Sequence, residues 1–93
     1  MKPQVFHINH CPKDAVYIGR PSKFGNPFVI GIDGTRREVI AKYKDWIYDN
    51  PELLQQIKDE LKGKHLSCWC KPKECHGDIL LEIANPNLSI LRF

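Results

Sequence analysis

Two consecutive amphipathic helices, encoded between residues 35 and 61, place the strongest constraint on how this chain can fold. Residues 35–38 (Thr-Arg-Arg-Glu) have the form of a capping box, in which the threonine and glutamate side chains each accept the other residue's amide. Asn50 followed by Pro51 is a preferred start for the second helix, and Gly63 supplies its stop. Apolar residues recur at helical spacing after each start. The predicted buried positions are Val39, Ile40, Tyr43, Trp46, Ile47, Leu53, Leu54, Ile57 and Leu61.

Strand-forming segments on both sides of these helices predict an α/β fold. Residues 4–9, 15–18 and 65–70 are predicted strands. A last helix is predicted from Cys75 or His76 to Ala84, and residues 88–93 are candidates for an edge strand. A chain of 93 residues suits a single domain spanning residues 1–93. We therefore expect a small, reduced two-layer or three-layer α/β sandwich, in which a short sheet packs against about three helices.

Charge and hydropathy narrow the classes of partner. The formal net charge is +3, and no long basic stripe is present, so sequence-specific DNA recognition is not expected. No apolar run approaches the roughly 20 residues that span a bilayer, and the N-terminus lacks the apolar core of a signal peptide. We therefore expect a cytoplasmic protein, in which the four cysteines are thiols or metal ligands before disulfides. Homodimerisation or a bound metal would supplement the small core.

A segment rich in glycine and proline separates the second predicted strand from the first helix. Residues 19–28 (Gly-Arg-Pro-Ser-Lys-Phe-Gly-Asn-Pro-Phe) contain two glycines and two prolines and follow no helix or strand pattern. Holding such a loop in one shape costs conformational entropy, so ordered loops of this length usually have a function. We predict that this segment forms part of a functional site.

The cysteine-rich segment, residues 68–78, has two chemical interpretations. Thiolate and imidazole are the natural ligands of zinc, so Cys68, Cys70, Cys75 and His76 are candidate zinc ligands. Their spacing is C-x-C-x4-C-H rather than the commoner C-x-x-C, and an extended strand holds Cys68 and Cys70 on one face without wrapping them round an ion. His10 and Cys11 from the N-terminal loop would complete the set.

The second interpretation places chemistry at the start of the last helix. Ligands of α/β folds bind beyond the carboxyl ends of strands, and the free amides of a helix start attract anions. Gly77 would let a ligand approach the backbone. The helix start is expected to lower the pKa of the Cys75 thiol, and His76 would stabilise the thiolate or act as an acid–base group. Cys75, His76 and Asp78 are therefore candidate catalytic residues.

Structural roles compete with each of these interpretations. Cysteine often packs as a small hydrophobe, which suits Cys68 on a central strand. Asp78 can cap the last helix, and Asn26 can bond its own backbone in a turn. Arg20 can form a surface ion pair. The lysines close to the cysteine segment, at positions 62, 64, 71 and 73, are either solvated surface residues or an electropositive rim for an anionic ligand.

Four motifs together resemble a known family. They are Tyr17-Ile18-Gly19-Arg20, Phe24-Gly25-Asn26-Pro27-Phe28, Cys68-Trp69-Cys70-Lys71-Pro72 and Cys75-His76-Gly77-Asp78. Over about residues 5–84 the chain resembles domain of unknown function 4326, a family of bacteria and their phages with no settled activity. The resemblance implies that residues 18–28 and 68–78 are signature loops and that the sandwich is Rossmann-like. By analogy, this Rossmann-like appearance implies kinship with small α/β domains that handle nucleotides or nucleobases. Cys11 lies outside this signature.

The two loops combine into a predicted site for a nucleotide, nucleoside or nucleobase. Arg20 and Lys23 would neutralise a phosphate, and Asn26 would recognise a polar edge of a base or sugar. Phe24 or Trp69 would stack on a ring. Whether such a site catalyses a reaction is open. The alternatives are a non-enzymatic module that sequesters a nucleotide and an interaction module stabilised by zinc.

Overall fold

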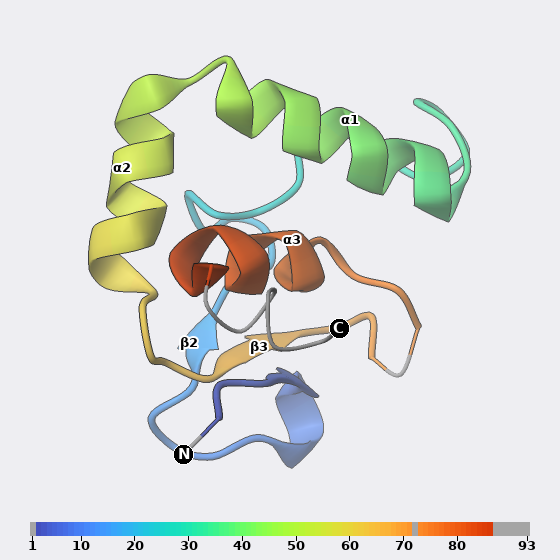
Figure 1. Cartoon of the computed structure of the whole chain (residues 1–93). Helices are drawn as coiled ribbons and strands as arrows, with labels where there is room; N and C mark the ends of the chain where they lie inside the picture. Colours follow the sequence, from blue (N-terminus) through green and yellow to red (C-terminus); the bar gives the residue numbers. More distant parts are fainter. Residues whose placement is uncertain (1, 72, 87–93) are drawn as a thin grey trace.

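The structure is a computed structural model, and it describes residues 2–71 and 73–86. In chain order, the elements are β1 (Val5–His7), the 3-10 helix η1 (Ile8–His10), β2 (Val16–Tyr17), α1 (Arg36–Tyr48), α2 (Pro51–Glu60), β3 (Leu66–Cys68) and α3 (His76–Ala84). Figure 1 shows the strands at one end of the molecule, α1 at the other and α3 between them. The predicted α/β class and its three helices are confirmed. None of these helices is long and apolar enough to cross a membrane.

The strands form a parallel sheet in the order β1-β3-β2. Central β3 is paired along both edges, so that Leu66 lies opposite Val5 of β1 and Val16 of β2. Every residue of β3 is buried, whereas those of β1 and β2 are half-buried. Because the strands are parallel, their carboxyl ends meet at one edge of the sheet, where ligands of α/β folds bind.

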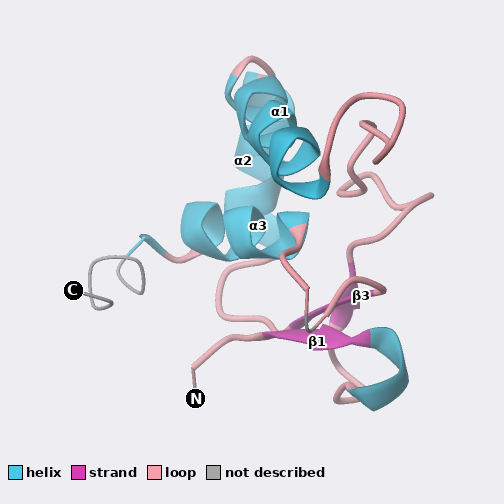
Figure 2. Cartoon of the chain, turned by 90° about the vertical axis from the view of Figure 1, so that its right-hand side faces the viewer, coloured by secondary structure: helices cyan, strands magenta, loops and turns pink. Residues whose placement is uncertain are grey.

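The three α-helices lie on the same side of the sheet (Figures 1 and 2). Helix α3 rests on β1 and β3, and α1 and α2 pack against α3. Gly77 permits this close approach, because a Cβ atom there would lie 2.7 Å from Ile18 Cδ1 and 3.0 Å from Val5 Cγ1. Helix α3 therefore lies between the sheet and α1, and α2 runs down beside α3 (Figure 1).

The helices begin where the capping signals predict. The Thr35 hydroxyl accepts the Glu38 N–H at 3.3 Å, and the Glu38 carboxylate accepts the Thr35 N–H at 2.9 Å. The Asn50 side chain accepts the Leu53 N–H at 3.5 Å, with Pro51 as the first residue of α2. Both starts are set by local sequence, since each cap and its partner are three residues apart.

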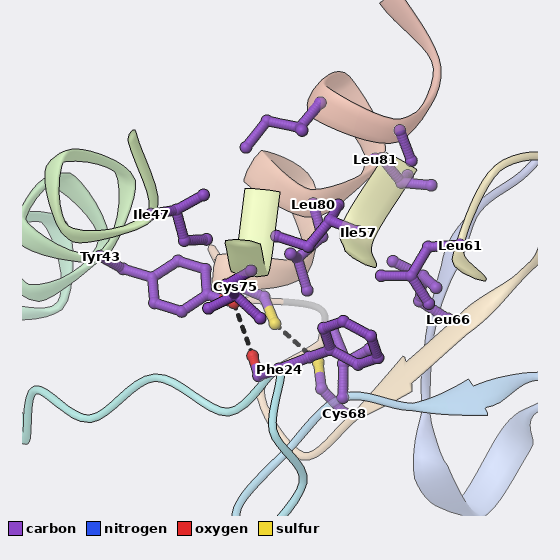
Figure 3. Packing of buried hydrophobic residues seen from close by; sticks show 14 residues of the cluster. Phe24, Tyr43, Ile47, Ile57, Leu61, Leu66, Cys68, Cys75, Leu80 and Leu81 are labelled. Atoms are coloured by element: carbon purple, nitrogen blue, oxygen red, sulfur yellow. Dashed lines mark hydrogen bonds between the residues drawn. The ribbon is translucent and has the colours of Figure 1, made fainter. Parts of the chain in front are cut away.

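Side chains from the three α-helices and from β3 form one hydrophobic core (Figure 3). The Tyr43 hydroxyl of α1 donates to the Phe24 carbonyl at 2.6 Å, which ties the loop of residues 19–28 to this core. Burial raises the pKa of Tyr43, so its hydroxyl keeps the proton that makes this bond. The fully buried core residues include Ile47, Ile57, Leu66 and Leu80.

The strands are shorter than the sequence predicts, because side chains beyond their ends bond elsewhere. After β1, the His7 imidazole accepts the Asn9 N–H at 3.1 Å and the chain turns into η1. Strand β3 ends at Cys68, and the next side chain, Trp69, is exposed and donates its indole N–H to the Tyr17 hydroxyl at 3.0 Å. The edge strand predicted for residues 88–93 lies outside the described residues.

Candidate functional site

A cavity of about 480 Å³ opens at the carboxyl edge of the sheet. Its lining comes from the ends of β2 and β3, the loop between β2 and α1, the first turns of α1 and the start of α3. This is where parallel sheets hold their ligands, and the volume falls within the roughly 300 to 1,000 Å³ that is usual for small-molecule sites. Residues from both predicted segments, 19–28 and 68–78, line the cavity.

Three cysteine thiols converge on this cavity. Cys68 ends β3, Cys70 lies in the turn that follows, and Cys75 is the N-cap of α3. Their sulfurs all lie within 4.8 Å of one another, and those of Cys68 and Cys75 point at each other across 2.7 Å (Figure 3). Cys11 lies outside the group, since its thiol donates to the Ile8 carbonyl. The three converging sulfurs are a donor set that suits a metal ion.

The two buried thiols of this group differ in acidity. Hydrogen bonding from Cys75 lowers the pKa of Cys68 to about 6, helped by the backbone amides of Cys70 and Lys71. Hydrogen bonding to Cys68, together with burial, raises the pKa of Cys75. The expected lowering of the Cys75 pKa by the helix start is therefore wrong. The Gly77 N–H does donate to the Cys75 sulfur at 3.3 Å, but burial and the neighbouring thiol outweigh it.

His76 is buried and held in one orientation by the backbone of residue 18. Its Nε2 atom lies 2.8 Å from the Ile18 carbonyl, and because a carbonyl can only accept, Nε2 must carry the proton. The pKa of His76 is lowered, chiefly by burial, which favours the neutral ring. The Nδ1 lone pair faces the Cys75 sulfur at 3.7 Å, so in this tautomer Nδ1 can accept from the thiol or hold a ligand.

Asp78 and Gly77 serve the start of α3. Asp78 accepts the Cys75 N–H at 3.4 Å, which completes a second capping box, and its other carboxylate oxygen pairs with Lys71 at 2.9 Å. The amides of Gly77 and Asp78 are occupied by the Cys75 sulfur and carbonyl. The expected opening of the backbone at Gly77 to a ligand is corrected, because that residue faces the sheet and does not line the cavity.

Two predicted ligand contacts, Phe24 and Lys23, lie away from the cavity. Phe24 is 4% exposed and belongs to the core, because burying a large apolar ring is more favourable than presenting it to water. The Lys23 ammonium pairs with Glu60 at the end of α2, at 2.8 Å. Of the two rings expected to stack on a ligand, Trp69 therefore lines the cavity and Phe24 does not, and the structure gives Lys23 a different partner.

Arg20 and Arg36 bring two positive charges to the cavity lining. Arg20 was expected there, and Arg36 was missed by the sequence analysis. The guanidinium of Arg36 donates to the Glu74 carbonyl at 3.1 Å, which directs it toward the cysteine segment. Its neighbour Arg37 is 86% exposed and pairs with the Glu74 carboxylate at 3.5 Å. No local signal separates these two arginines, because the packing of α1 decides which one faces inward.

Asn26 and Trp69 also line the cavity. The Asn26 side chain accepts the Phe28 N–H at 2.9 Å and donates to the Val39 carbonyl at 3.1 Å, so it performs the turn role weighed above. Trp69 is 61% exposed while its indole N–H bonds the Tyr17 hydroxyl. The Tyr17 hydroxyl in turn donates to the Arg20 carbonyl at 2.9 Å, so Tyr17 links the Trp69 side chain to the Arg20 backbone.

The match to a family model decides what kind of domain this is. The model described as domain of unknown function (DUF4326) covers residues 5–86. The chain belongs to the DUF4326 family. The resemblance seen in the four sequence motifs is thereby confirmed. The matched region includes every residue that lines the cavity of this DUF4326 domain.

Relatives of this DUF4326 chain come from viruses. It is 38% identical over 74 residues to an uncharacterized 12.4 kDa protein in the nrdA-td intergenic region of Enterobacteria phage T4, over 75% of this chain and 67% of the relative. It is 35% identical over 86 residues to the uncharacterized protein R718 of Acanthamoeba polyphaga mimivirus, over 73% of this chain and 65% of the relative. The chain thus spans about two thirds of each relative's length. No solved structure matches it.

Proposed function

We propose that this DUF4326 domain binds a small anionic, nucleotide-like ligand in the cavity at the carboxyl edge of its sheet. The observation that carries the proposal is that two arginines and an exposed tryptophan line one cavity of about 480 Å³. A nucleotide combines a phosphate with a planar ring, and these are the two chemical groups that such a lining recognises.

The anionic part of the ligand is assigned to Arg20 and Arg36. Both guanidinium groups are permanently charged and present planar forks of donors that match phosphate. Arg36 donates one N–H to the Glu74 carbonyl, and its guanidinium has further N–H groups that can bind a ligand. Asp78, the acidic group at the start of α3, is paired with Lys71, which reduces its repulsion of an anion.

The planar part of the ligand is assigned to Trp69. Its ring is oriented by the bond to Tyr17 and by edge-on packing against His7, with ring centroids 5.8 Å apart. A large aromatic side chain that is both fixed and 61% exposed offers a stacking surface at low entropic cost. This arrangement favours a base or similar ring over an anion alone.

Binding is the extent of this proposal, and catalysis by Cys75, His76 and Asp78 stays a prediction. Cys75 is 1% exposed and its sulfur accepts the Gly77 amide, the His76 ring is bound to a backbone carbonyl, and Asp78 caps α3. A module that sequesters a nucleotide without turnover needs none of these groups to react, and the geometry is compatible with it.

The test is calorimetric titration of the purified chain with nucleoside mono-, di- and triphosphates, the matching nucleosides and free bases. We expect phosphorylated compounds to bind more tightly than nucleosides that share the same ring. Arg36→Gln should weaken nucleotide binding by about tenfold or more, because a charge-assisted hydrogen bond is worth roughly 1.5–3 kcal/mol. Arg37→Gln is the matched control, since that neighbour carries the same charge but is 86% exposed and outside the lining.

Two results would contradict the proposal. One is the absence of binding by any member of the panel at millimolar concentration. The other is equal weakening by Arg36→Gln and Arg37→Gln, which would indicate long-range attraction by net charge rather than recognition in the cavity.

A further inference from the structure

The proposed ligand site leaves the three clustered cysteines without a role. Three sulfurs within 4.8 Å of one another come from a strand end, a turn and a helix cap. Packing alone does not require sulfur at each place, since small apolar side chains fill such positions equally well. The polar groups around the sulfurs therefore indicate whether the cluster is a packing feature or a metal site.

A backbone amide donates to one sulfur of the cluster, since the Gly77 N–H bonds the Cys75 sulfur at 3.3 Å. Amide donors stabilise thiolate over thiol, and thiolate is the form that binds a metal. One amide donor that suits a ligating thiolate is therefore in place before any ion arrives.

His76 is oriented as a fourth ligand. Metal-binding histidines usually donate their second ring nitrogen to a carbonyl or carboxylate, which fixes the tautomer and the ring orientation. The Nε2 atom of His76 makes such a bond to the Ile18 carbonyl at 2.8 Å, and Nδ1 is left 3.7 Å from the Cys75 sulfur. All four residues contact the same cavity.

We propose that Cys68, Cys70, Cys75 and His76 together bind one zinc ion. Three thiolates and one imidazole are a donor set that tetrahedral zinc takes in structural sites. Zinc–sulfur bonds of about 2.3 Å place two sulfurs roughly 3.8 Å apart in a tetrahedron. The 3.7 Å between Cys75 Sγ and His76 Nδ1 suits one edge of such a site. Because His76 is not among the atoms that lie within 4.8 Å of one another, its ring moves toward the other sulfurs as the ion enters, and the 2.7 Å between the Cys68 and Cys75 sulfurs widens. Thiol protons are released to solvent on binding.

The zinc ion would hold together the elements that form one side of the cavity. It would join the end of β3 to the start of α3, and so close the segment that carries Trp69 and Glu74 into a loop anchored at both ends. The zinc proposal does not depend on a nucleotide-like ligand, because every observation behind it concerns contacts among the chain's own atoms.

The first test is the metal content of the chain purified without a tag or chelator, followed by replacement of zinc with cobalt. We expect about one zinc per chain and, in the cobalt form, the intense ligand-to-metal absorption of bound thiolates. Cys70→Ser should lose most of the metal and weaken that absorption. It is the variant of choice because Cys70 is half-buried and lies outside the helices and strands. Cys11→Ser is the matched control and should keep one zinc, since Cys11 is outside the cluster.

Counting the cysteines that react with a thiol reagent distinguishes a zinc-bound cluster from free thiols and from a disulfide. With zinc bound, we expect Cys11 to react with a thiol reagent, and all four cysteines to react after chelation and unfolding. The proposal is overturned if the fully reduced chain shows four reactive thiols and takes up neither added zinc nor cobalt. It is also overturned if two thiols return on reduction and metal binding is still absent, which would identify a Cys68–Cys75 disulfide. Calorimetric titration of the metal-free chain with nucleotides tests the ligand-binding proposal separately.

Discussion

At the scale of single residues, the small size of Gly77 matters as much for building the site as the chemistry of its neighbours. Gly77 lets the start of α3 lie directly on the sheet, with Ile18 and Val5 occupying the space that a side chain would need. That contact sets the position of Cys75, which is the N-cap of α3, and of His76, which is its first residue. A glycine that looks like a ligand contact in the sequence is thus part of the packing that builds the site.

Gly77→Ala should destabilise the protein by about 1–2 kcal/mol. The added methyl group overpacks the contact with Ile18 and Val5, which costs roughly 1–3 kcal/mol, while alanine recovers part of that through its higher helix propensity. Urea denaturation measures the difference. In an Ile18→Val background, which removes the Cδ1 atom 2.7 Å from the new Cβ, the added cost of Gly77→Ala should shrink. An unchanged cost in that background would show that Val5 or the backbone, rather than Ile18, sets the limit.

At the scale of elements, two capping boxes fix the helix starts that border the cavity. Thr35 and Glu38 hold the start of α1, which carries Arg36, and Cys75 and Asp78 hold the start of α3. Cysteine is not among the preferred N-cap residues, and its use at α3 follows from its place among the clustered sulfurs rather than from capping strength. The helix starts therefore link local sequence signals to the geometry of the site.

The capping carboxylate of α1 makes stability depend on acidity. Bonds from the Thr35 backbone amide and hydroxyl hold the pKa of Glu38 below its ordinary value of 4.5. Because the folded pKa is the lower one, the stabilisation is present above pH 4.5 and is lost as the pH falls through the folded value. We expect Glu38→Gln to lower the melting temperature at neutral pH and to do so less at about pH 3. A difference that stays constant across this range would mean that the charge of Glu38 contributes nothing to the cap.

At the scale of the whole molecule, a single small core supports the sheet, the helices and the cavity together. The core residues come from elements far apart in the sequence, and the Tyr43 hydroxyl joins the core to the loop that lines the cavity. A chain of 93 residues has a modest core, so each large buried side chain carries a substantial fraction of the stability. Loss of core packing should therefore affect the site as well as the helices.

Ile57→Ala should cost about 2–5 kcal/mol, the range for removing a fully buried aliphatic side chain. We expect helix content by circular dichroism and tryptophan fluorescence to report one shared transition, at a lower urea concentration than in the unmodified chain. Ile32→Ala is the matched control, because Ile32 is 81% exposed and its removal should change stability little. Separate transitions by the two probes would show that the core and the cavity segments unfold independently.

Local sequence alone determined the three helices, their starts and most of their buried faces. The capping pairs are three residues apart and the apolar stripes follow one helical period, so each signal is complete within a short stretch of chain. The two segments that line the cavity were also predicted, because their glycines, prolines and cysteines stand out locally from the helix and strand patterns around them.

The tertiary structure decided what depends on residues far apart in the sequence. It brought Arg36 and Arg20 to the same cavity, buried Phe24, paired Lys23 with Glu60 and turned Gly77 toward the sheet. It also reversed the expected acidity of Cys75, because the effect of a helix start is local whereas burial and the approach of Cys68 arise only on folding. Periodicity and capping are properties of a segment, but the direction of a side chain and the charge it meets are properties of the packed molecule.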